Sequence, residues 1–195
     1  MTTNAKPKAK QVLTPEFRVS FPAVFTARSA AEGQEAKFSI TMLFPKSTDI
    51  SVLKNAVLEA IVEKWGADKA KWPKGLRLPF RDGSEKDYDG YEDVVFCTAS
   101  SKMRPGLVDQ NRQAIIAPDE FYGGCYARAT IAAFAYDKAG NKGVSWGLRN
   151  IQKTRDGEPF SGRSKPENDF DAIPMPKAGP GEAGAKGQSL DEMLS

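Results

Sequence analysis

The sequence contains no histidine and only two cysteines among its 195 residues. Without histidine there is no Ser–His or Cys–His catalytic pair, no imidazole general base and no His-containing zinc site. Two cysteines are too few for a Cys₄ zinc site or a disulfide framework. Carboxylate-bound Mg²⁺ remains open, but the acidic residues lie mostly in turn-like stretches such as RDGSEKDYDGYED. We therefore expect neither a metal ion nor a cofactor.

The usual signatures of enzymes and of membrane proteins are also missing. The chain has no Walker loop, GxGxxG or GxSxG motif, so we expect no enzyme and no catalytic residues, although lysine- or carboxylate-based chemistry stays open. It has no apolar run of membrane-spanning length, and its start, MTTNAKPKAK, lacks the hydrophobic segment of a signal peptide. We interpret Cys97 and Cys125 as small buried thiols in a reducing compartment. These features predict a cytosolic protein without a membrane partner.

Charge is unevenly distributed along the chain. Residues 1–166 hold 26 Lys and Arg against 19 Asp and Glu, a net charge of +7, whereas residues 167–195 hold 2 against 6, a net charge of −4. A basic body joined to an acidic segment suggests an anionic partner for the body. Taken alone, the charges are explained more simply by two solvated surfaces whose compositions differ by chance.

Residues 122–153 predict a long β-hairpin, because two alternating runs flank a short loop of Gly, Asn and Lys. A strand alternates its faces, so one face of the first run would be small and apolar and the other would carry rings and a guanidinium. The first face comprises Cys125, Ala127, Ala129, Ile131 and Ala133, and the second comprises Tyr126, Arg128, Thr130, Phe134 and Tyr136. The returning run adds Trp146, Arg149 and Lys153. Rings beside cations suit single-stranded nucleic acid, but the same rings could fill a core.

The rest of the chain predicts further strands and one helix. Alternating apolar residues predict strands over 16–27, 36–44 and 91–100, and Pro22 suggests a sheet edge or a bulge in the first of them. A short hairpin is expected through Val108 and residues 115–116. Residues 49–65 have the apolar spacing of a helix, which Thr48 or Asp49 would begin and Gly66 would end. Residues 67–90 form a long polar insertion, for which function or mere tolerance is equally plausible.

This order of elements predicts a mainly β fold, an OB-fold-like five-stranded barrel with one helix and long loops. The helix falls between the second and third strands rather than between the third and fourth. We divide the chain into a flexible basic arm at 1–15, a barrel domain at 16–172 and a disordered acidic tail at 173–195, because the tail is rich in Pro, Gly and Ala.

Six sequence blocks in a fixed order resemble a family of tailed-phage single-stranded DNA-binding proteins. They are VSFPAVFTA, KFSITMLFPK, LPFRDGSEK, RPG, FYGGCYARATIAAFAYD and NKGVSWGLRNIQK, within about residues 16–172. The resemblance implies an OB-fold core, sequence-nonspecific binding of single-stranded DNA, and work beside replication or recombination proteins in the host cytoplasm during phage infection. It also suggests an acidic tail that contacts protein partners. This chain departs from that pattern, because it ends in Leu194 and Ser195 rather than in an aromatic residue.

If the chain binds single strands, rings would stack on bases while cations contact phosphates. We expect Tyr122, Tyr126 and Trp146 to be the stacking platforms. The expected phosphate contacts are Arg128, Arg149, Lys153, Lys102, Arg104 and Arg81, with Lys37 and Lys46 as additions from the second strand. Each ring could instead belong to the core, and each cation could be an idle surface charge.

Other functions remain open at this point. The main rival is a non-enzymatic β-barrel that binds protein as an assembly or interaction factor. A strand-annealing protein is another, and a nuclease ranks last. The sequence leaves the oligomeric state undetermined.

Overall fold

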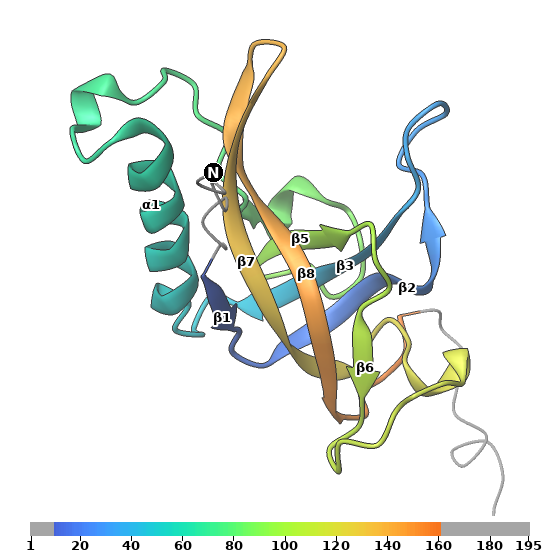
Figure 1. Ribbon diagram of the computed structural model, residues 1–195. Helices are drawn as coiled ribbons and strands as arrows, with labels where there is room; N and C mark the ends of the chain where they lie inside the picture. The colour runs from blue at the N-terminus through green and yellow to red at the C-terminus, as the bar shows by residue number, and fades with distance from the viewer. Residues whose placement is uncertain (1–9, 161–195) are drawn as a thin grey trace, which may run out of the picture. The chain divides into compact units, whose positions relative to one another are not determined.

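The computed structural model describes residues 10–160, so most of the predicted arm and the whole predicted tail lie outside the described residues. The described chain is mainly β with one α-helix (Figure 1). The strands are β1 (Gln11–Leu13), β2 (Phe17–Arg28), β3 (Lys37–Pro45), β4 (Arg81–Asp82), β5 (Val94–Ser101), β6 (Gly106–Val108), β7 (Tyr126–Lys138) and β8 (Asn141–Arg155). The helices are α1 (Ser51–Trp65) and the short 3₁₀ turns η1 (Lys69–Lys71), η2 (Gly83–Glu85) and η3 (Pro118–Glu120).

Five strands close into a barrel. β2 pairs with β3, β3 with β5, and β7 with β8, all antiparallel. The barrel closes through a parallel β5–β8 pairing and an antiparallel β2–β7 pairing. This order, with a single parallel contact between the third and last barrel strands, confirms the predicted OB-fold-like barrel. The helix lies between β3 and β4, as the sequence indicates.

The β7–β8 hairpin has the two faces that alternation predicts. Ala127, Ala129 and Ile131 point into the core, whereas Arg128 and Phe134 are exposed. The two strands stay in register over most of their length and project beyond the barrel (Figure 1). The small residues of β7 leave room inside the barrel for larger side chains from the other strands, and those side chains form its main core.

A bulge interrupts β2 at Phe21 and Pro22. The register with β3 shifts between Ser20, which faces Thr41, and Ala23, which faces Ser39, so β2 has one residue more than β3 here. Phe21 has a φ of 43° and its side chain is 61% exposed. The bulge thus turns a residue outward that alternation places on the same face as buried Phe17 and Val19.

Helix α1 covers one end of the barrel and buries Leu53, Ala56, Val57, Ala60 and Ile61. It begins two residues later than predicted, and Asp49 accepts a hydrogen bond from the N–H of Ser51 without being the capping residue. Gly66 ends it with a φ of 87°, as predicted. Among residues 10–160, no helix is long and apolar enough to cross a membrane.

Two short segments differ from the sequence predictions. Residues 11–13, assigned to the flexible arm, form β1 and pair with β7, and the buried hydroxyl of Thr14 accepts a hydrogen bond from the N–H of Ala129. The predicted hairpin through Val108 is reduced to one bridge between Val108 and Ala114. Backbone hydrogen bonds from Ile115 to Leu107 and from Asp109 to Gln113 flank this bridge, and β6 pairs along its other edge with β8, in parallel.

Candidate nucleic-acid interface

The outer face of β2, β3 and β5, called the binding face below, carries a ladder of hydroxyl groups. Ser39 lies opposite Ser100, and Thr41 lies opposite Thr98 with a 3.0 Å hydrogen bond between their hydroxyls. One end of this ladder is the floor of a groove of about 470 Å³, which the β2–β3 loop borders. The groove is lined by Arg28, Ala30, Gln34, Glu35, Lys37, Ser39, Thr98 and Ser100. Its hydroxyl floor and cationic walls suit a sugar–phosphate backbone.

Cations gather around this groove, including Lys37 and Lys102, which the sequence predicts. Arg28 and Lys37 form its walls, and neither makes an ion pair with any residue in 10–160. Lys102 lies 2.8 Å from Glu35, an exposed pair, and its hydrogen bond is the main reason that the pKa of Glu35 is lowered. Arg104 lies over the ring of Phe25 at 5.6 Å. An exposed ion pair contributes only about 0–1 kcal/mol, so a phosphate can replace Glu35 at little cost.

An aromatic cluster of Phe21, Tyr88, Tyr91 and Phe96 lies on the same face. Successive rings meet edge to face, at 5.3 Å for Phe21–Tyr88, 5.4 Å for Tyr88–Tyr91 and 5.2 Å for Tyr91–Phe96. Tyr91 and Phe96 are buried and the Tyr91 hydroxyl hydrogen-bonds Ser20 at 3.0 Å, whereas Phe21 is 61% and Tyr88 49% exposed. The buried pair therefore supports two exposed rings, which is the arrangement that base stacking requires.

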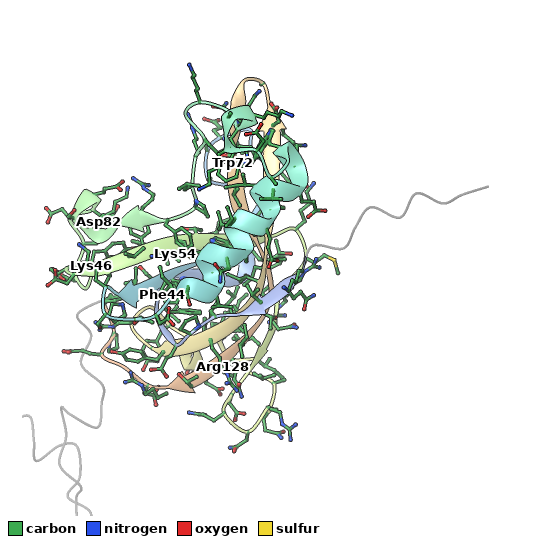
Figure 2. The ribbon with its side chains drawn as sticks, turned by 90° about the vertical axis from the view of Figure 1, so that its left-hand side faces the viewer. Phe44, Lys46, Lys54, Trp72, Asp82 and Arg128 are labelled. Atoms are coloured by element: carbon green, nitrogen blue, oxygen red, sulfur yellow. The ribbon has the colours of Figure 1, made fainter. Side chains whose placement is uncertain are left out.

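Arg81 and Lys46 lie at another edge of the binding face, and both are ion-paired. Arg81 contacts Glu85 at 2.6 Å and its guanidinium lies 5.4 Å from the centre of the Phe96 ring. Lys46 lies 2.9 Å from Asp82, and Figure 2 shows the two side by side. Hydrogen bonds from Lys46 and from the N–H of Ser84 lower the pKa of Asp82 to about 2. These cations are accessible but carry their own counter-charges.

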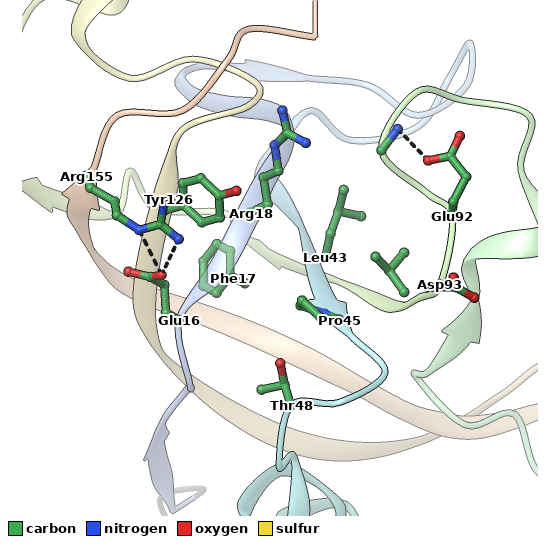
Figure 3. A pocket seen from close by; sticks show the side chains of 12 residues that line it. Glu16, Phe17, Arg18, Leu43, Pro45, Thr48, Glu92, Asp93, Tyr126 and Arg155 are labelled. Atoms are coloured by element: carbon green, nitrogen blue, oxygen red, sulfur yellow. Dashed lines mark hydrogen bonds and ion pairs between the residues drawn. The ribbon is translucent and has the colours of Figure 1, made fainter.

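A second pocket, of about 610 Å³, contains Tyr126 (Figure 3). One face of its ring is covered by the guanidinium of Arg155 at 3.4 Å, and Arg155 is itself bonded to Glu16 at 2.9 Å. Burial raises the pKa of Glu16, but hydrogen bonds from Thr154 and Arg155 outweigh it and the net pKa is lowered. Arg18 borders the pocket and lies under the ring of Phe160 at 4.1 Å. Tyr126 thus has at most one ring face left for a base.

Tyr122 and Lys153 hold the base of the β7–β8 hairpin together. The Tyr122 hydroxyl donates to Asp156 at 2.9 Å. The ammonium of Lys153 donates to the carbonyl of Glu120 at 2.7 Å, pairs with Asp156 at 2.8 Å and lies over the Tyr122 ring at 5.4 Å. The Lys153 side chain is only 12% exposed. This placement favours a structural role for both residues over the predicted contacts with DNA.

Arg128 and Arg149 lie on the outer side of the β7–β8 hairpin and are exposed. The guanidinium of Arg128 donates to the side chain of Gln152 at 2.9 Å. In Figure 2, Arg128 lies apart from Lys46 and Asp82. The predicted cations therefore lie in four places: the groove, the edge that carries Arg81 and Lys46, the hairpin base and the outer side of the hairpin. At the groove, Lys37 and Lys102 lie together with Arg28.

The structure corrects the prediction for Trp146. Its ring is 0% exposed and packs edge to face on Phe80 inside the barrel, so it offers no face to a base. Its indole N–H has no hydrogen-bond acceptor among the described residues. The sequence contained the signal, because Trp146 shares its parity with Val144 and Leu148, which are also buried.

Four residues of this interface were missed by sequence reasoning: Phe21, Tyr88, Arg28 and Arg18. Phe21 could have been found from Pro22, because a bulge at that proline reverses the side on which the preceding residue lies. Tyr88 lies in a polar loop that gives no periodic signal. Arg28 and Arg18 become notable only when the strand register places them beside a groove or pocket.

Residues 10–179 match the family model described as Enterobacter phage Enc34, ssDNA-binding protein. Protein p50 of Acyrthosiphon pisum secondary endosymbiont phage 1 is 38% identical, and the match covers 74% of this chain and 83% of that protein.

Solved structures agree with the family match. The single-stranded DNA-binding protein from bacteriophage Enc34 in complex with ssDNA superposes with a TM-score of 0.65 at 26% identity, covering 77% of this chain and 89% of that one. The single-stranded DNA-binding protein gp2.5 of bacteriophage T7 superposes with a TM-score of 0.56 at 10% identity, covering 80% and 97%, which shows a shared fold.

Fold and binding face together define an OB-fold protein of the kind that phages encode for single strands. The family match extends over more than half of the chain. The chain belongs to the Enterobacter phage Enc34 ssDNA-binding protein family.

Proposed function

We propose that this protein binds single-stranded DNA without sequence preference and coats and protects it during phage DNA replication or recombination. The observation that carries the proposal is the binding face, where the exposed rings of Phe21 on β2 and Tyr88 in the loop before β5 lie on the same side of the sheet as a groove with a hydroxyl floor and cationic walls. Family membership and the Enc34 complex with ssDNA support the same partner.

Two interactions would contribute to the binding free energy on this face, base stacking and phosphate contacts. Phe21 and Tyr88 stack on bases, and each stacked ring contributes about 1–3 kcal/mol whatever the base, because every base has a π-face. Arg28, Lys37 and Lys102 bind phosphates and release counterions, so affinity falls with added salt. Neither interaction involves hydrogen bonds to base edges, so the binding tolerates any base sequence.

The remaining elements of the proposal concern the setting of the protein. It works without catalysis, in the cytoplasm of the infected host. Residues 167–195, with a net charge of −4, lie outside the described residues, and their charge suits competition with DNA for the basic groove at high effective concentration. DNA binding then releases this segment to contact replication or recombination proteins.

The test is a salt titration of binding to a single strand, a duplex and an RNA of equal length. We expect the single strand to bind most tightly, with similar affinity for different sequences. The logarithm of the association constant should fall with the logarithm of salt concentration by about 0.7 for each phosphate neutralised. Affinity independent of salt, or equal for single strand and duplex, would favour a protein-binding barrel instead.

Truncation after Pro166 removes the whole net charge of −4 and tests the role of the acidic segment. It should tighten DNA binding, most visibly at low salt, where charges are least screened. Full-length and truncated proteins of equal affinity at low salt would leave residues 167–195 without a part in DNA binding.

A further inference from the structure

The segment between α1 and β4 carries a dense group of cations that the proposed function does not use. Residues 69–77, KAKWPKGLR, contain four cations and no carboxylate. Lys69, Lys71, Lys74 and Arg77, called the basic platform below, are all exposed. Within residues 10–160 none of the four makes an ion pair, in contrast to Arg81, Lys46 and Lys102.

The platform is built on a fixed scaffold. The indole N–H of Trp72 donates to the carbonyl of Gly66 at 2.8 Å, and Trp72, Leu76 and Phe80 pack against the main core. Figure 2 shows Trp72 near the end of α1. A loop that is merely tolerated on the surface would not need three apolar side chains to anchor it. The anchors fix the backbone that carries the cations, so little order has to be gained when a ligand binds.

The hairpin tip is attached to the same scaffold. The N–H of Arg77 donates to the carbonyl of Lys142 at 3.0 Å, and the N–H of Val144 donates to the carbonyl of Arg77 at 2.9 Å. Figure 1 shows this segment beside the β7–β8 hairpin. The tip brings two more cations, Lys138 and Lys142, of which Lys142 pairs with Asp137 at 3.3 Å. The excess of positive charge therefore extends from the platform onto the hairpin.

The platform adjoins the binding face. Arg81 lies four positions after Arg77 in the chain, a span of at most about 14 Å. Arg81 pairs with Phe96 of β5 and lies over its ring, so it belongs to the edge of the aromatic cluster. A strand that leaves the exposed rings across this edge meets the platform next.

We propose that the basic platform binds the phosphate backbone of the same DNA strand as it leaves the binding face. This inference rests on the proposed function and adds a second contact region to it. Like charges held together without counter-charges repel one another, and a polyanion relieves this repulsion while it releases counterions. Its one aromatic ring, that of Trp72, is half-buried, so the platform adds affinity for backbone and not for bases.

The test uses a triple variant of the full chain, Lys69→Gln, Lys71→Gln and Lys74→Gln, and two oligonucleotides of about 6 and about 16 nucleotides, near the two ends of the range of OB-fold site sizes. The short strand should occupy the binding face alone, and the long strand should also reach the platform. A matched control removes three cations that lie outside both regions, Lys10, Lys54 and Arg112, each replaced by Gln.

We expect the triple variant to bind the short strand like the control variant. For the long strand, its salt slope should fall by about 2, since each lost single-strand phosphate contact removes about 0.7. Equal losses for the two strands, or no loss relative to the control for either, would overturn the inference; the second outcome would point to an acidic protein as the partner of the platform. If neither oligonucleotide binds the unmodified protein, the proposed function itself fails.

Discussion

The inside of the barrel and its binding face both depend on aromatic side chains, but these side chains do different work. Inside, Trp146 is 0% exposed and packs on Phe80. Outside, Phe21 is 61% exposed although its ring meets that of Tyr88, which in turn packs on the buried Tyr91. The difference teaches that a ring near cations in the sequence is evidence for binding only when the fold leaves one of its faces open.

Replacing Trp146 should give the largest effect, and on stability. Trp146→Ala leaves a cavity in the barrel, and removal of a buried aromatic side chain costs about 3–5 kcal/mol of unfolding free energy. Urea denaturation measures this cost. At a temperature where the variant remains folded, its affinity for single strands should match that of the unmodified protein. A variant of normal stability with weakened binding would show that the ring meets DNA.

Replacing the exposed rings should weaken DNA binding and leave stability almost unchanged. Phe21→Ala and Tyr88→Ala should each weaken single-strand binding by about 1–3 kcal/mol, with almost no change in salt slope because no charge is lost. Unfolding free energy should change much less than for Trp146→Ala. Phe134→Ala is the matched control, since Phe134 is 45% exposed on β7, outside the aromatic cluster. Equal losses of affinity for Phe134→Ala and Phe21→Ala would show that base stacking is not confined to the binding face.

Removing single charges should distinguish the groove, where we expect DNA contacts, from the hairpin base, where we expect none. Lys37→Gln and Arg28→Gln should each reduce the salt slope by about 0.7. Lys153→Gln should leave the slope unchanged, because its ammonium is held by Glu120 and Asp156. Fluorescence anisotropy at several salt concentrations gives all three slopes. A larger change for Lys153→Gln than for Lys37→Gln would move the DNA path to the β7–β8 hairpin.

The smallest effect concerns the thiols. Cys97 and Cys125 are both buried, and burial raises the pKa of Cys97 to about 12. Only the thiolate is reactive, so neither thiol should react with a maleimide in the native protein at neutral pH, and both should react in denaturant. Mass spectrometry after brief labelling measures this. Rapid native labelling of Cys97 would indicate that the barrel opens between β3 and β5.

Much of the fold could be predicted from the sequence because its strands are regular. The two faces of β7 follow from strict alternation, and α1 follows from apolar residues at helical spacing. The site was less predictable. Alternation assigns residues to two faces without saying which is inside, and for Trp146 only the neighbours on its own face, Val144 and Leu148, decide the question.

Irregular features account for most of the remaining differences. A single extra residue at the Phe21 bulge turned a ring outward. Ion pairs such as Lys153–Asp156 join residues that sequence inspection counts separately as cation and anion. The groove between Lys37 and Ser100 exists only after β3 and β5 are paired. Such features depend on tertiary contacts that no local pattern contains.

The parallel closure between β5 and β8 also has a consequence for how the protein is made. β2, β3 and β5 leave the ribosome first, and their inner residues, such as Met42 and Cys97, have no cover until β7 and β8 follow. At about 5–20 residues per second, the 54 residues that follow Ser101, up to Arg155, take about 3–11 s to synthesise. During this interval β4 covers part of the outer β5 edge, but Ala99 and Ser100 still lack their partner strand, so we expect chaperones to contact the nascent sheet mainly then.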